Sequence, residues 1–266
     1  MPTATSKDGT RIAYDREGQG PALILVDGAM CYRASGPAKP LAKLLTNDFT
    51  VITYDRRGRG ESGDTAPYAV EREVEDLDAV IQAVGGSAFV YGISSGAALA
   101  LEAANRLGGI RKLVLYEAPF VVDSSISPLP GDFLAQLKQF VAAGKRGEAV
   151  KLFMRRVGVP GFGIFVMQLL PVWKKLTGIA HTLPYDITII QNYSTGKALP
   201  QGQWANAAIP AIVADGGKSP AWIRNSAAAL AKAVPNGSYR TLPGQTHMLK
   251  PQAVAPMLME FFKEEL

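Results

Sequence analysis

The stretch from Phe89 to Leu101 constrains the fold of this chain more than any other part of the sequence. It consists of an apolar run, a glycine-rich turn and a second run of small apolar residues. Gly92, Ser94 and Gly96 form the pattern G-x-S-x-G, in which a serine occupies a strained turn between a strand and a helix. Glycine is needed on both sides because the two backbones approach closely there. The stretch therefore predicts a nucleophilic serine, Ser94, at the end of a buried strand.

Short apolar runs bounded by Gly, Pro or Asp alternate with helical patterns along most of the chain. Such runs are typical of strands buried on both faces of a parallel sheet. They occur at residues 22–26, 50–54, 88–91, 112–116 and 210–214. Between residues 71 and 84, apolar side chains recur at helical spacing and form one helix face. The alternation predicts an α/β fold with a doubly wound parallel sheet.

The alternation stops near Pro119 and resumes near Ile209. The sequence between them carries apolar residues in helix-like clusters, and several prolines separate these clusters. We therefore expect residues 1–120 and 201–266 to form the α/β core, and residues 121–200 to form a helical cap inserted after a strand.

The composition is that of a globular protein with a large apolar core. The chain has 266 residues, of which 47% are hydrophobic and 19% are charged. It lacks an apolar run of about 18 residues that could span a bilayer, and residues 1–9 lack the apolar stretch of a signal peptide. A lone cysteine, Cys31, excludes an intramolecular disulfide and is typical of a reducing compartment. We therefore expect a cytoplasmic protein with no membrane partner.

The positive charges are scattered along the chain. The net charge is +5, and the densest basic group is Arg56-Arg57-Gly58-Arg59, within one short loop. A nucleic-acid-binding protein would instead present a basic face or stripe. We therefore expect no nucleic-acid partner.

His181 and His247 are the two histidines of the chain. A zinc site would need carboxylates for most of its ligands, so we expect no metal.

His247 follows a late strand and precedes a helix predicted over residues 254–262, which allows it to reach Ser94 across the end of the sheet. Histidine suits removal of a serine proton near neutral pH. We predict that His247 is the base. For His181, packing or solvent exposure is favoured, and lining of a pocket is the alternative.

The chain resembles the α/β-hydrolase superfamily over essentially its whole length. The motifs that carry the resemblance are Asp27-Gly28-Ala29, the D-x-R-G-x-G-x-S loop from Asp55 to Ser62, the turn at Ser94, and the Gly-x-x-His that ends at His247. The resemblance implies an eight-stranded, mostly parallel sheet with a helical cap between strands six and seven.

The resemblance also implies an oxyanion hole, a pair of N–H groups that binds the negative charge of the reacting oxygen. The N–H groups of Ala29 and Ser95 stand at the matching positions. Asp27 replaces the histidine that the superfamily usually carries after strand three. It either faces the site and alters its field, or turns away and hydrogen-bonds the loop.

The third member of the implied catalytic triad is a carboxylate that orients the histidine. The superfamily usually has it in a G-x-x-D pattern after strand seven, but here the sequence is Gly216-Gly217-Lys218-Ser219. Glu117 and Asp215 are the alternatives. Glu117 ends strand six, where some superfamily members place the acid, whereas Asp215 comes four residues too early. We favour Glu117, and a site without a carboxylate remains a third alternative.

These features predict a serine hydrolase without a cofactor. Ser94 would attack a small to medium, mostly apolar carboxylic ester, lactone or thioester, and water would then cleave the acyl-enzyme. The small molecule is the expected partner, and a homodimer is left open. Two alternatives remain: a cofactor-free haloperoxidase or lyase that uses the same triad, and a ligand-binding receptor on the same fold.

Overall fold

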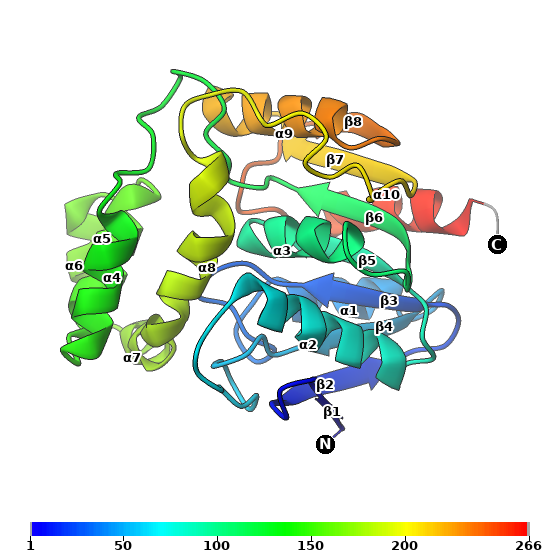
Figure 1. The fold of residues 1–266 in the computed structure, drawn as a ribbon, viewed down its shortest axis with the longest axis horizontal. Helices are drawn as coiled ribbons and strands as arrows, with labels where there is room; N and C mark the ends of the chain where they lie inside the picture. Colours follow the sequence, from blue (N-terminus) through cyan, green and yellow to red (C-terminus); the bar gives the residue numbers. More distant parts are fainter. Residues whose placement is uncertain (1, 265–266) are drawn as a thin grey trace.

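A single eight-stranded sheet forms the centre of the molecule (Figure 1), in the order β1-β2-β4-β3-β5-β6-β7-β8. A computed structural model describes residues 2–264. The strands are β1 (Thr3–Thr5), β2 (Arg11–Glu17), β3 (Ala22–Val26), β4 (Thr50–Tyr54), β5 (Ala88–Ile93), β6 (Ile110–Tyr116), β7 (Ala211–Gly216) and β8 (Gly237–Leu242). β1 and β2 pair in antiparallel fashion, and β3 to β8 run parallel. The predicted eight-stranded, mostly parallel sheet is confirmed.

Helices cover both faces of the sheet, because its central strands are apolar on both sides. Every residue of β4, β5 and β7 is buried. The core on one face includes α2 (Val70–Ala83), α3 (Ser95–Ala104) and α9 (Ala221–Ala233). The core on the other includes α1 (Ala38–Leu45) and α10 (Pro251–Lys263). Phe89 of β5 stacks there on Phe262 of α10 with ring centroids 5.0 Å apart. The arrangement is doubly wound, as the alternation of strands and helices predicts.

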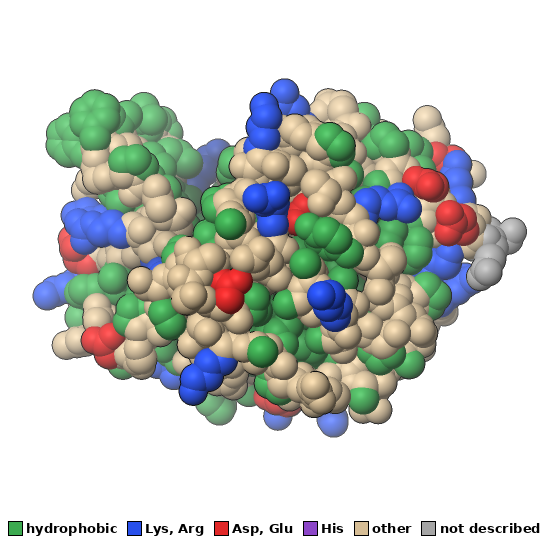
Figure 2. All heavy atoms as spheres, turned by 90° about the horizontal axis from the view of Figure 1, so that it is seen from above, with side chains coloured by type: hydrophobic (Ala, Val, Ile, Leu, Met, Phe, Trp, Pro, Cys, Tyr) green, Lys and Arg blue, Asp and Glu red, His purple; other side chains and the backbone are tan. Residues whose placement is uncertain are grey.

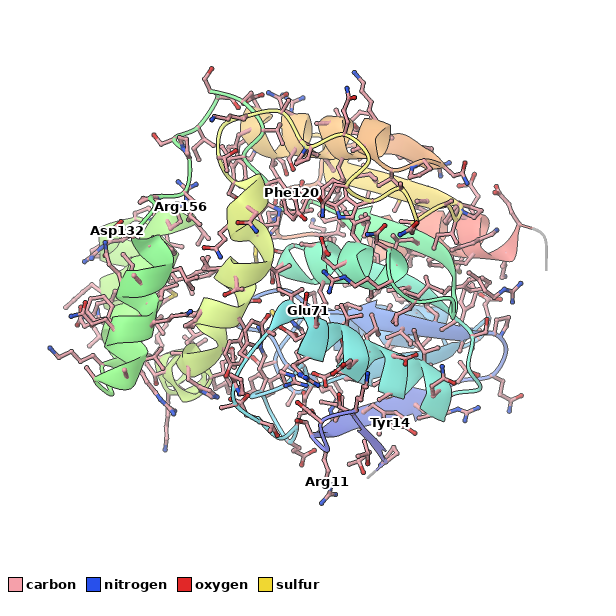
Figure 3. The ribbon with its side chains drawn as sticks, viewed as in Figure 1. Arg11, Tyr14, Glu71, Phe120, Asp132 and Arg156 are labelled. Atoms are coloured by element: carbon pink, nitrogen blue, oxygen red, sulfur yellow. The ribbon has the colours of Figure 1, made fainter. Side chains whose placement is uncertain are left out.

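The segment from residue 121 to 200, which we call the insertion, is helical. Its helices are α4 (Phe133–Ala142), α5 (Arg146–Arg156), α6 (Gly161–Gln168), α7 (Pro171–Gly178) and α8 (Leu183–Ile190), with short 3₁₀ turns at Ala180–Thr182 and Gln191–Tyr193. In Figure 1, α8 lies between the sheet domain and the other four. Figure 3 shows Asp132 and Arg156 on this outer group of helices and Glu71 on α2 in the sheet domain.

The insertion also carries most of the exposed apolar side chains of the described chain. Apart from Val157, which directly follows α5, they lie on α6, on α7 and in the turn between them: Phe162, Phe165, Val166, Leu169, Leu170 and Val172. Figure 2 shows hydrophobic side chains gathered at this end of the molecule. Among residues 2–264, no helix combines the length and the apolar character that crossing a membrane requires.

Candidate active site

Ser94 occupies the turn between β5 and α3, where its backbone has φ 58° and ψ −129°. The neighbouring backbones leave no room for side chains. A Cβ added to Gly92 would lie 2.5 Å from the carbonyl oxygen of Gly96, and one added to Gly96 would lie 2.6 Å from that of Asp27. A Cβ on Gly28 would lie 2.8 Å from the Ser94 Cβ. Glycine at these positions therefore permits the strained turn that the sequence predicts.

Backbone strain gathers at one edge of the sheet. In the range 2–264, the non-glycine residues with positive φ are Met30, Ser94 and Glu117, at 61°, 58° and 49°. They follow the carboxyl ends of β3, β5 and β6, which meet at the same edge because these strands are parallel. Such conformations cost about 1–3 kcal/mol each and concentrate at functional sites. This edge is therefore where a candidate active site belongs.

Glu117 and His247 form a direct pair at this edge. Glu117 Oε2 lies 2.7 Å from His247 Nδ1, and the glutamate side chain is fully buried. The other carboxylate oxygen accepts hydrogen bonds from the Gly216 N–H at 2.7 Å and from the Ser219 hydroxyl at 2.5 Å. Burial acts to raise the pKa of Glu117, but the hydrogen bonds from His247, Ser219 and Gly216 bring it below its ordinary value. The carboxylate is therefore charged and fixed beside the ring.

Asp215, the alternative acid, has a different partner. Its Oδ2 accepts a hydrogen bond from the Tyr239 hydroxyl at 2.5 Å, and Asp215 forms no hydrogen bond with His247. Ser219 stands where the usual G-x-x-D pattern has its aspartate, and its hydroxyl binds Glu117 instead. Of the two carboxylates, the structure brings Glu117 to the histidine.

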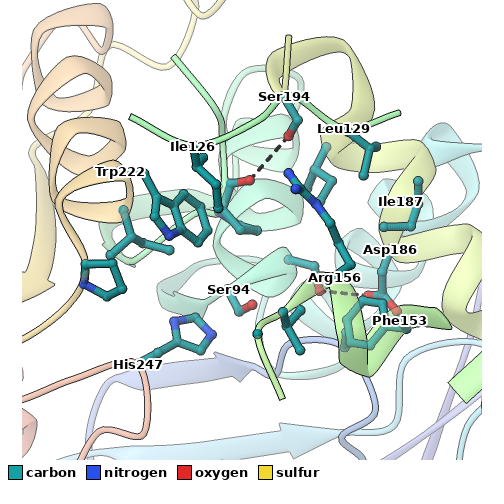
Figure 4. A pocket seen from close by; sticks show the side chains of 18 residues that line it. Ser94, Ile126, Leu129, Phe153, Arg156, Asp186, Ile187, Ser194, Trp222 and His247 are labelled. Carbon is teal, nitrogen blue, oxygen red and sulfur yellow. Dashed lines mark hydrogen bonds between the residues drawn. The ribbon is translucent and has the colours of Figure 1, made fainter. Parts of the chain in front are cut away.

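Ser94 and His247 line the same cavity of about 400 Å³ (Figure 4). Because Nδ1 of His247 is held by Glu117, Nε2 is the ring nitrogen left for Ser94. No hydrogen bond joins the Ser94 hydroxyl to His247 in the described chain, and such contacts often tighten only when substrate binds. The two side chains lie next to each other in the close-up view.

The backbone N–H groups of Ala29 and Ser95 are free of protein acceptors. Both residues line the cavity beside Ser94. Within residues 2–264, neither N–H donates a hydrogen bond to another group of the chain. Free N–H groups beside a nucleophile are what an oxyanion hole requires.

Asp27 is not among the residues that line this cavity. It is buried and accepts a hydrogen bond from the backbone N–H of Ala38, the first residue of α1. Burial raises the pKa of Asp27 to about 7, against the opposing effects of that hydrogen bond and of the Arg59 and Arg56 charges. The side chain therefore turns away from the cavity, as in one of the two expected orientations, but its hydrogen bond goes to the start of α1 and not to the loop.

Comparison with known proteins shows to which family this chain belongs. The sequence pattern of the alpha/beta hydrolase family matches residues 23–257. The chain belongs to the alpha/beta hydrolase family. It is 50% identical to a solved alpha/beta hydrolase from Sphaerobacter thermophilus, over 98% of this chain and all of that one, with a TM-score of 0.89.

Two more distant similarities accompany this one. The alpha/beta hydrolase chain is 31% identical over 157 residues to the uncharacterized hydrolase YraK of Bacillus subtilis, a match that covers 55% of each protein. It thus spans about half the length of this curated relative. An enol-lactonase from Burkholderia xenovorans is 20% identical over 98% of this chain and 99% of its own, with a TM-score of 0.70, and shares the fold.

A buried ionic cluster joins the insertion of this alpha/beta hydrolase to the candidate site. Asp186 of α8 accepts hydrogen bonds from Arg56 at 2.8 Å, from Arg59 at 2.7 and 2.8 Å, and from the Ser95 hydroxyl at 2.7 Å. Glu73 of α2 pairs with the other edge of Arg56 at 2.7 and 2.8 Å. Two guanidinium charges and two carboxylate charges thus cancel beside the cavity.

The cluster reaches the backbone of the candidate oxyanion hole. Arg59 donates a hydrogen bond of 2.7 Å to the carbonyl oxygen of Gly28. That carbonyl belongs to the same peptide group as the Ala29 N–H. Arg56 and Arg59 occupy variable positions of the D-x-R-G-x-G-x-S loop, and Asp186 lies 130 and 127 residues away from them. No local sequence pattern links residues so far apart, so this cluster cannot be predicted from the sequence.

His181 is not among the residues that line the cavity. Its Nε2 lies 3.7 Å from Asp64 Oδ2, and about a quarter of its side chain is exposed. Burial lowers the pKa of His181, with the Arg146 charge acting in the same direction and Asp64 against it. His181 therefore packs against a loop of the sheet domain, which is the role favoured from the sequence.

The cavity wall is mainly apolar. The apolar side chains of this wall come mainly from the insertion and from α9. They include Ile126, Leu129, Phe153, Ile187, Ile190 and Trp222. Among residues 2–264, no group of three or more His, Cys, Asp or Glu side chains is placed to hold a metal ion.

Proposed function

We propose that this alpha/beta hydrolase is a serine hydrolase that works through an acyl-enzyme on Ser94. His247 Nε2 takes the hydroxyl proton as Oγ attacks the substrate carbonyl carbon, and then delivers it to the departing alcohol or thiol. A water molecule, deprotonated by the same nitrogen, cleaves the acyl-enzyme and regenerates Ser94. The observation that carries the proposal is the 2.7 Å pair between Glu117 and His247 next to a strained serine turn.

Glu117 is the proposed orienting acid. Its carboxylate fixes the His247 tautomer with the proton on Nδ1 and stabilises the ring when it becomes charged. The hydrogen bonds from Gly216 and Ser219 hold the carboxylate in place, so its geometry is set before substrate arrives. A preorganised charge needs no rearrangement during the reaction.

The N–H groups of Ala29 and Ser95 are the proposed oxyanion donors. In the Gly28–Ala29 peptide, the charged hydrogen bond from Arg59 to the carbonyl oxygen polarises the group and makes its N–H a stronger donor. On the other side, Asp186 holds the Ser95 hydroxyl, which fixes the residue that follows the nucleophile. The insertion thus supports the site as well as covering it.

The expected substrates are small to medium carboxylic esters, lactones or thioesters. A cavity of about 400 Å³ with a mainly apolar wall accommodates a compact acyl group. Residues 121–200 supply much of that wall, so we propose that they act as a cap that sets the substrate range. The structural neighbour described as an enol-lactonase makes lactones a natural part of the test.

The test is a panel of p-nitrophenyl esters, lactones and acyl-thioesters on the wild type and on Ser94→Ala. We expect turnover of at least one class and a loss of several orders of magnitude in the variant, because the nucleophile and base act as one unit. Equal activity of the two proteins would contradict the proposal, because turnover would not depend on the Ser94 hydroxyl. Turnover that needs Ser94 but forms no acyl-enzyme would favour the haloperoxidase or lyase alternative. Ligand binding with no turnover in the wild type would favour the receptor alternative.

A further inference from the structure

Arg156 lies in the wall of the cavity, and its positive charge is not paired with a carboxylate of any described residue. It is the last residue of α5, and its side chain extends into the cavity, with His247 on the other side of Ser94 (Figure 4). Its guanidinium donates a hydrogen bond of 3.1 Å to the carbonyl oxygen of Ser127. In residues 2–264, no carboxylate lies within ion-pair distance of Arg156.

The carboxylates near the cavity are already held by other groups of the protein. Asp186 also lines the wall, but its charge is shared by Arg56 and Arg59. Glu117 is not among the residues that line the cavity, and its carboxylate accepts hydrogen bonds from His247, Gly216 and Ser219. A guanidinium carries five N–H donors, so Arg156 keeps several for a ligand after its bond to the backbone.

The surroundings of Arg156 make an unpaired charge costly. Burial is the cause that lowers the pKa of Arg156, and no neighbouring acid offsets it. The cavity wall around it is apolar, with Ile126, Leu129 and Phe153 among its members. A partly buried cation in such a wall is stabilised when an anion enters, because ion pairs are stronger where water is scarce.

We propose that Arg156 binds a carboxylate of the substrate, so that the preferred substrates are esters or lactones whose acyl part carries a second, ionised carboxyl group. This inference rests on the proposed function, since it names the substrate class of the same site. Arg matches the planar carboxylate with two parallel hydrogen bonds, which gives orientation as well as attraction. The apolar wall between Ser94 and Arg156 would hold the methylene chain that joins the two carbonyl groups.

The experiment uses matched pairs of substrates. Monoethyl esters of glutaric, adipic and suberic acid carry the ionised carboxylate at three distances from the ester. The corresponding ω-amides have the same shape without the charge. Ethanol release gives kcat and KM for wild type, Arg156→Gln, Arg156→Lys and Arg155→Gln. Arg155 is the matched control, because it precedes Arg156 on the same helix and is exposed.

We expect the wild type to favour the acid over the amide for at least one chain length. A charged hydrogen-bonded contact is worth about 1.5–3 kcal/mol, so Arg156→Gln should lower kcat/KM for the acid by about 10- to 100-fold, mainly through KM. The amide should change by less than about 2-fold, and Arg155→Gln should resemble the wild type. Arg156→Lys should retain part of the preference, because it keeps the charge but not the planar fork.

Hydrolysis of both esters without preference, or equal losses in the two glutamine variants, would overturn the inference and leave the proposed function intact. Hydrolysis of neither ester would count against the proposed function. Calorimetric binding of monoethyl adipate to Ser94→Ala and to Ser94→Ala/Arg156→Gln then tests Arg156 without turnover. Binding that disappears in the double variant supports the carboxylate site, and equal binding by both proteins contradicts it.

Discussion

Glu117 Oε2 lies 2.7 Å from His247 Nδ1, so the acid that holds the histidine comes from the end of β6 and not from the loop after β7. The exchange is possible because β6 and β7 are parallel neighbours whose ends meet at one edge. The end of β7 and the loop after it still contribute, because the Gly216 N–H and the Ser219 hydroxyl bind the same carboxylate. A carboxylate directly after β6, held by these two donors, thus takes the place beside the histidine that the usual pattern gives to an aspartate.

Glu117→Gln should lower kcat by about 10²- to 10⁴-fold while the fold is retained. The amide keeps an acceptor for Gly216 and Ser219, but it presents an NH₂ group or a neutral oxygen to His247 and removes the charge that stabilises the protonated ring. Steady-state kinetics with any substrate from the ester panel, together with a thermal unfolding curve, checks this. Asp215→Asn is the matched control and should lower kcat by less than about 3-fold. A similar loss in both variants would refute the assignment of Glu117.

The sequence predicts the sheet and the reactive edge because their signals are local. The apolar runs of β3 to β7 and the glycines around Ser94 depend on neighbouring residues, and the structure has both where they are expected. Glu117 could be favoured as the acid because position 219 holds a serine where the superfamily usually has the aspartate. To place Glu117 near His247, it is enough to know where its strand ends and that the neighbouring strands are parallel.

The Arg56, Arg59 and Asp186 cluster and the position of Arg156 could not be predicted in the same way. Asp186 is separated from its arginines by more than a hundred residues, and helical periodicity says nothing about which face of α8 meets the sheet domain. The sequence indicates a basic loop, whereas in the structure Arg56 and Arg59 are buried and form ion pairs with Asp186. Contacts of this kind depend on how the insertion packs on the core.

Asp186→Asn should destabilise the protein by about 3–5 kcal/mol, because it leaves the charges of Arg56 and Arg59 buried with one carboxylate fewer. Urea unfolding of the variant and the wild type measures the difference. Asp132→Asn, at the outer edge of the insertion in Figure 3, is the control and should change stability by less than about 0.5 kcal/mol. Equal stability of Asp186→Asn and wild type would show that the cluster does not hold the insertion to the core.

The raised pKa of Asp27 should make the stability of the protein depend on pH. Its pKa is about 7 in the folded protein against an ordinary value near 3.8, so the folded state binds the proton more tightly than the unfolded state. The resulting stability is fully present below about pH 4 and is lost as the pH rises through 7. Compared with Asp27→Asn, the wild type should therefore lose about 2–4 kcal/mol of unfolding free energy between pH 4 and pH 8. If the unfolding free energies of the two proteins changed with pH in the same way, the raised pKa of Asp27 would be contradicted.

Mass spectrometry after reaction with a fluorophosphonate tests the central claim most directly, because the reagent modifies a serine only where an activated hydroxyl and an oxyanion site meet. We expect one modified residue, Ser94, with no labelling of Ser94→Ala and slow labelling of His247→Ala and Glu117→Gln. Modification of another residue in the wild type, or undiminished labelling of the Ser94→Ala protein, would contradict the account.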